Sequence, residues 1–163
     1  MGKVLIFGNE DDPEYAETAA ALERFGVYAE SARGNDISEA DIVVFVNPGA
    51  KLPPPELPRE CIGIAADDDL PSLNVLKRSG SRAVTCGFSA SCAVTISGLD
   101  GDRAAVGIQR DLVSAGGGII EAREIPVSVG GINSPFAIMA AVAAALCSDS
   151  ENRGFYEKTP KKS

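Results

Sequence analysis

Short apolar runs alternate with helical segments along the first half of the chain, and this alternation constrains the fold more than any other feature. Two of the segments between the runs carry helical spacing of apolar residues and start signals, at Pro13 and near Pro71. Strands that alternate with helices form a parallel sheet with crossover helices. We therefore predict an α/β fold with a Rossmann-like, mostly parallel sheet flanked by helices. The predicted strands are residues 3–7, 27–29, 41–46, 61–65 and 82–86.

The pattern changes in the second half of the chain. Residues 92–97 and 103–109 are extended segments separated by a glycine- and aspartate-rich turn, and 121–129 is a third extended segment. These three segments predict a small antiparallel ribbon attached to the parallel sheet. Ser134 and Pro135 then begin a helix whose alanine-rich, uncharged body reaches Cys147. Its small side chains predict close packing against the sheet.

The length of 163 residues fits one domain. We predict a single α/β domain over residues 1–149 and a polar, frayed tail over 150–163. No run is as long as the ~20 apolar residues that a membrane-spanning helix needs.

Charge and composition exclude several classes of function. Lys and Arg number 15 against 23 Asp and Glu, and the last thirteen residues carry a net positive charge, so the body is even more acidic. This balance argues against nucleic-acid binding. The chain has no histidine, which rules out Ser–His and Cys–His dyads and His-ligated zinc. Its four cysteines form no C-x-x-C pair, so we expect free thiols and a cytoplasmic location.

The first strand-to-helix turn, residues 8–14, lacks the features of a phosphate-binding loop. It contains four acidic residues and a proline, and it has no G-x-x-x-x-G-K-[ST] motif. Its carboxylates would repel phosphate, so we expect no ATP chemistry there. We expect these acidic residues instead to cap the following helix and to complement its dipole.

Polar residues at the predicted strand ends are the candidates for a binding site. Asn9 follows the first strand, Asp67 and Asp68 follow the fourth, and Asn133 precedes the last helix. Ligands bind outside the carboxyl ends of parallel strands, so these four residues are expected to surround one cleft. Such a cleft suits a cation, an amine, a hydroxyl-rich ligand or a basic partner loop. The alternative is that each residue caps its own turn and faces water separately; we predict no catalytic residue, metal or cofactor.

Three motifs resemble the middle domain of the Mur ligase family, the ATP-dependent ligases of peptidoglycan synthesis. Residues 65–68 (AADD) occupy the place of the family motif N-x-D-D, and residues 85–87 (TCG) occupy the place of T-[FY]-G. Residues 131–143 occupy the place of G-x-H-N-x-x-N-x-x-A-A-x-A. The family keeps a polar residue at four positions of these motifs where this chain differs from it. Those positions are Ala65, Asn133, Ser134 and Ala137.

The resemblance implies a Mur-ligase-like scaffold that has lost its ATP-handling groups, and hence no enzymatic activity. We expect a domain that binds a protein partner, such as a full-length ligase, or a small molecule, with a link to peptidoglycan synthesis. The alternative is a metal- or nucleotide-binding enzyme related to ATP-dependent ligases that uses the edge formed by Asp67 and Asp68.

Overall fold

The structure is a computed structural model, and it describes residues 3–33, 35–47 and 56–148. Within these residues the chain forms a large sheet, three α-helices, a short 3₁₀ helix and a separate two-stranded hairpin. The predicted tail, residues 150–163, lies outside the described residues. The helices are α1 (Pro13–Arg24), η1 (Ile37–Glu39), α2 (Leu70–Ser79) and α3 (Pro135–Cys147). The strands are β1 (Val4–Gly8), β2 (Ala29–Ser31), β3 (Ile42–Val46), β4 (Ile62–Ala66), β5 (Arg82–Cys86), β6 (Val94–Asp100), β7 (Arg103–Ile108), β8 (Leu112–Val113), β9 (Ile119–Ile120) and β10 (Arg123–Ser128).

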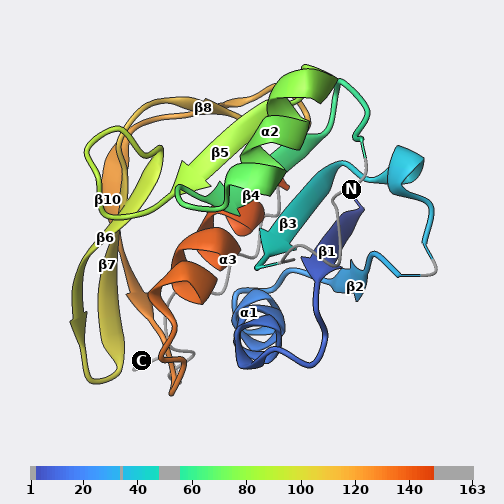
Figure 1. Ribbon diagram of the computed structural model, residues 1–163. Coiled ribbons are helices and arrows are strands. Elements are labelled where there is room, and N and C mark those ends of the chain that lie inside the picture. Colours follow the sequence, from blue (N-terminus) through green and yellow to red (C-terminus); the bar gives the residue numbers. More distant parts are fainter. Residues whose placement is uncertain (1–2, 34, 48–55, 149–163) are drawn as a thin grey trace, which may run out of the picture.

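The large sheet has the strand order β10-β7-β6-β5-β4-β3-β1-β2 (Figure 1). The pairs from β2 to β6 are all parallel, which confirms the predicted α/β class and the mostly parallel sheet. In this order the chain moves outward in one direction from β1 to β2 and in the other from β3 to β5. The topological switch point therefore lies between β1 and β3, where ligands of doubly wound sheets usually bind.

The antiparallel strands extend the same sheet. β6 pairs in parallel with β5 through Cys86 and Val94, then antiparallel with β7, which pairs antiparallel with β10. The predicted ribbon is therefore part of the main sheet, and the glycine-rich residues 116–118 form the turn between β8 and β9. The second strand begins at Ala29, two residues later than predicted, because the Val27 amide donates to the Leu22 carbonyl and closes the turn after α1.

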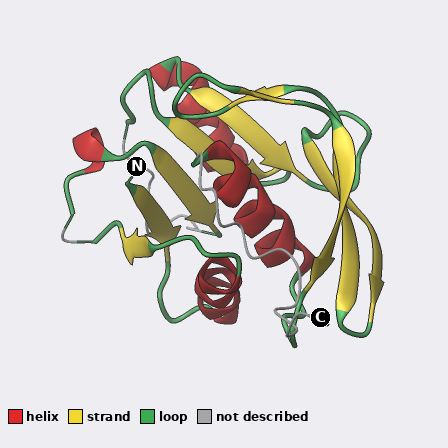
Figure 2. Ribbon diagram, turned by 180° about the vertical axis from the view of Figure 1, so that it is seen from behind, coloured by secondary structure: helices red, strands yellow, loops and turns green. Residues whose placement is uncertain are grey.

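The central strands β1, β3 and β4 of the sheet are covered on both faces, and the pleat decides which side chains each face receives (Figures 1 and 2). Val4 and Ile6 of β1 point to the face packed by α1 and α3, while Leu5 between them points to the face packed by Leu76 of α2. Burial on both faces explains why these strands are continuous apolar runs.

Helix α3 occupies the centre of the protein, between α1 and the antiparallel strands in Figure 2. All residues from Ala137 to Cys147 are buried, so the helix has no solvent-facing side. Its alanines permit this, since small side chains let the helix approach the sheet and α1 at once. None of the helices in the described residues is long and apolar enough to cross a membrane.

Candidate functional site

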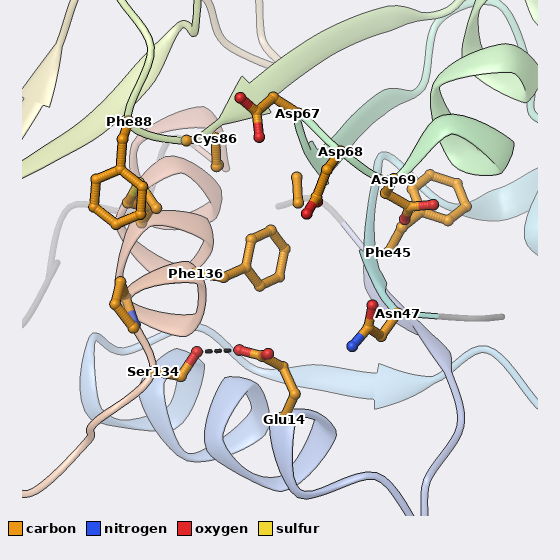
Figure 3. A pocket seen from close by; sticks show the side chains of 14 residues that line it. Glu14, Phe45, Asn47, Asp67, Asp68, Asp69, Cys86, Phe88, Ser134 and Phe136 are labelled. Carbon is orange, nitrogen blue, oxygen red and sulfur yellow. Dashed lines mark hydrogen bonds between the residues drawn. The ribbon is translucent and has the colours of Figure 1, made fainter.

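A cavity of about 330 Å³ lies where the carboxyl ends of β3, β4 and β5 meet the first turns of α1 and α3 (Figure 3). It is next to the switch point, where the general rule for parallel sheets places a ligand. None of its described lining residues is basic, while four are acidic and three are phenylalanines. The lining residues are Glu14, Phe45, Asn47, Ala66, Asp67, Asp68, Asp69, Cys86, Gly87, Phe88, Ser134, Pro135, Phe136 and Met139.

Asp67 is held against the loop that follows β5. Its amide donates to the Cys86 carbonyl at 3.0 Å, and its Oδ2 accepts from the Cys92 thiol at 3.5 Å. A Cβ at Gly87 would lie 2.7 Å from the Asp67 carboxyl carbon, so only glycine leaves room for this carboxylate. The Asp67 backbone is thus held to the end of β5, and its exposed carboxylate lies against Gly87 and accepts from the Cys92 thiol.

Asp68 and Asp69 differ in their surroundings. Asp68 is exposed at the cavity. Asp69 is the N-cap of α2, and its Oδ1 accepts from the Ser72 amide at 3.3 Å. The other Asp69 oxygen is shielded from solvent and has no hydrogen-bond partner among the described residues. Of the three consecutive aspartates, Asp69 is therefore the one that caps the helix.

Two glutamates of α1 cap the amino end of α3. The Glu17 Oε1 atom accepts from the Asn133 and Ser134 amides at 2.8 and 2.9 Å, and Glu14 Oε2 accepts from the Ser134 hydroxyl. Helix amino ends attract anions because their amides are unpaired and the helix dipole is positive there. Here the Asn133 and Ser134 amides, which directly precede the first helical turn, are already bound to a carboxylate of the protein itself, and the Ser134 hydroxyl accepts from the Ala137 amide as the N-cap.

Sequence reasoning missed the contacts of Glu14 and Glu17. It assigned the acids near Pro13 to the dipole of their own helix, and Asp12 is indeed the N-cap of α1. Glu14 and Glu17 are three residues apart and so share one face of α1. That spacing was the available signal, but nothing local indicated that α3 would pack beside this face.

Asn47, directly after β3, has a φ of 41° in the left-handed region. Asparagine adopts this conformation more readily than other side-chain-bearing residues. In this conformation the Asn47 amide group lies at the cavity, across from Phe136 in Figure 3. The cavity thereby gains one neutral polar side chain beside its carboxylates.

The four residues predicted for one cleft are divided between different places. Asp67 and Asp68 line the cavity, but neither Asn9 nor Asn133 does. Asn9 lines a second hollow beside Ser31 and Arg33, and its side chain accepts from the Asp11 amide at 3.0 Å. Asn133 is exposed and contributes its backbone amide to Glu17.

The cavity offers binding groups but no activated nucleophile. Cys86 is buried at its inner end, and burial, with the nearby Cys92, Cys147 and Asp67, raises the pKa of this thiol far above its usual value. Burial also raises the pKa of Cys92. Both groups are therefore neutral thiols at physiological pH and weak nucleophiles. In the described part of the chain, no three His, Cys, Asp or Glu side chains are grouped so that they could hold a metal ion.

Among the described residues, the four acidic side chains of the cavity have no cationic partner. Within the described residues, none of Glu14, Asp67, Asp68 and Asp69 forms an ion pair with lysine or arginine. The carboxylates of the cavity can accept hydrogen bonds from an ammonium or guanidinium group, and the phenylalanine rings can pack against the alkyl chain that carries it.

Comparison with known proteins gives no family assignment. The sequence matches no family model, and no curated protein is significantly similar to it.

Proposed function

We propose that this chain is a non-catalytic binding domain of the Mur ligase middle-domain type, and that its carboxyl-edge cavity binds a cationic group of a partner protein or small ligand. The observation that carries the binding proposal is the lining: four carboxylates, three phenylalanines and no basic side chain among the described residues. An ammonium or guanidinium group would find acceptors there, and its alkyl stem would pack on the rings.

The scaffold part of the proposal rests on motif order. A strand ending in A-A-D-D, a strand ending in T-C-G, antiparallel strands and an alanine-rich helix follow one another as in the Mur ligase middle domain. The proposed link to peptidoglycan synthesis, with a full-length ligase as partner, rests on this resemblance.

The binding proposal is tested with a matched pair of ligands. Arginine amide, acetylated at its α-amino group so that the guanidinium is its only charge, should shift the NMR amide signals of residues 66–69 and 86–88 at roughly millimolar concentration. Citrulline amide acetylated in the same way has nearly the same shape and no positive charge, and it should leave those signals unchanged.

A matched pair of variants localises the effect. Asp67→Asn with Asp68→Asn should abolish the shifts caused by arginine amide. Asp102→Asn with Glu121→Gln removes the same charge from exposed positions elsewhere and should retain them. Equal responses to arginine amide and citrulline amide, or equal responses of the two double variants, would contradict the proposal.

The alternative of a nucleotide-binding enzyme predicts a different result with Mg-ATP. The acidic loop after β1 and the glutamates at the amino end of α3 leave no place for a triphosphate, so we expect no heat of binding in calorimetric titration with Mg-ATP up to millimolar concentration. Micromolar binding would contradict the non-catalytic proposal and favour the enzyme that uses Asp67 and Asp68.

A further inference from the structure

Two large exposed apolar side chains belong to the chain segments that form the acidic cavity. Phe88, which lines it, is 72% exposed, and Leu70, which does not line it but directly follows the lining residue Asp69, is 63% exposed. Figure 3 shows Phe88 and Asp69 on opposite sides of the cavity. Exposed apolar residues are common singly, but one that lines a cavity, with a second next in sequence to a lining residue, marks a candidate contact surface.

The exposure of Phe88 is imposed by a well-held loop. The Gln109 side-chain amide donates to the Ser89 and Cys92 carbonyls at 3.0 and 2.8 Å, and the Arg110 guanidinium donates to the Ser91 carbonyl. The Ser91 amide also donates to Ser89 Oγ at 3.0 Å. The loop that carries Phe88 is therefore held in place, so contact of Phe88 with a partner would cost little ordering of the loop.

We infer that the cavity and its two apolar neighbours form a docking surface for an extended segment of a partner protein, in which a lysine or arginine is flanked by large apolar residues. This inference rests on the proposed function and names its ligand class. The basic side chain enters the cavity toward Asp67 and Asp68. The flanking apolar residues cover Phe88 and Leu70.

The size of the surface favours a protein segment over a small amine. A free amine within a cavity of about 330 Å³ would contact only the part of Phe88 that lines it and would leave Leu70, which does not line it, in water. A chain that continues beyond the cavity can cover the rest of both side chains, and aromatic rings such as that of Phe88 are enriched at protein interfaces. The net charge of the protein, −8, also complements the positive charge of a basic partner segment.

Selection from a displayed library of random heptapeptides against the full chain tests the inference. We expect enrichment of peptides in which Arg or Lys neighbours Leu, Ile or Phe. A synthetic peptide of the enriched sequence should bind less tightly as the salt concentration rises, because screening weakens the charge attraction.

Matched variants test both parts of the surface. Phe88→Ser should weaken peptide binding by roughly tenfold or more, whereas Tyr28→Ser, at an aromatic residue 79% exposed beside β2, should not change it. Asp67→Asn with Asp68→Asn should weaken binding to a similar degree and reduce its salt dependence. The control Asp102→Asn with Glu121→Gln should bind like the wild type.

The outcomes separate this inference from the proposed function. If arginine amide binds but no basic-apolar peptide is selected, or Phe88→Ser binds the peptide as well as wild type, the inference is wrong and the proposed function stands. If neither arginine amide nor peptide binds, both are wrong. If sedimentation shows self-association that Phe88→Ser abolishes, the surface joins two copies of this chain and the partner inference is overturned.

Discussion

Replacing Ile138 with alanine is expected to lower the free energy of unfolding by about 2–5 kcal/mol. Ile138 is fully buried in α3, the helix that contacts α1 and five strands of the large sheet. Loss of its branched side chain leaves a cavity that this surrounding core cannot readily close. Urea unfolding followed by circular dichroism measures the change through the shift in midpoint at constant slope.

Ile119→Ala provides the matched control for that experiment. It removes the same atoms from β9, where Ile119 is 64% exposed. Its free energy of unfolding should stay within about 0.5 kcal/mol of wild type. If both variants lost the same stability, α3 would not be the centre of the core, and the proposed correspondence of residues 131–143 with the Mur ligase helix would lose its structural basis.

The elements that sequence reasoning placed well are those with local signals. The runs beginning at residues 3, 41, 61 and 82 are mostly apolar and are followed within two residues by glycine, asparagine or aspartate, and each forms a strand within a residue of its predicted bounds. Ser134 and Pro135 marked the start of α3 equally well. These signals depend only on residues that are adjacent in sequence, so they can be recognised without knowledge of the tertiary structure.

What sequence reasoning missed depends on residues that meet only in the fold. β6 extends to Asp100 because it pairs with β7 across a register shift between Ile96 and Gly98, which no local pattern encodes. The residues of the candidate site show the same difference between local signals and contacts made only in the fold. Asp67 and Asp68 follow a strand that was recognised, whereas Glu17 reaches residues more than a hundred positions away. Asn9 lines a different hollow beside Ser31 and Arg33, and this placement likewise depends on residues distant in sequence that lie side by side only in the fold.

Replacing Gly8 with alanine is expected to cost about 1–3 kcal/mol of stability. Gly8 pairs with Val46 in the register of β1 and β3, and a Cβ at Gly8 would lie 2.3 Å from the Val46 carbonyl oxygen. Backbone atoms cannot rotate away as a side chain can, so the two strands must separate at the switch point. Urea unfolding measures the loss of stability.

Gly98→Ala separates this close approach from the general effect of adding a methyl group. No heavy atom lies within 4 Å of a Cβ at Gly98, so this variant should be as stable as wild type or up to about 1 kcal/mol more stable. The site provides a second readout. Asn47, which lines the cavity, directly follows Val46, so strand separation in Gly8→Ala should also weaken binding of arginine amide. A Gly8→Ala variant with wild-type stability and wild-type affinity would show that β1 and β3 do not approach this closely beside the cavity.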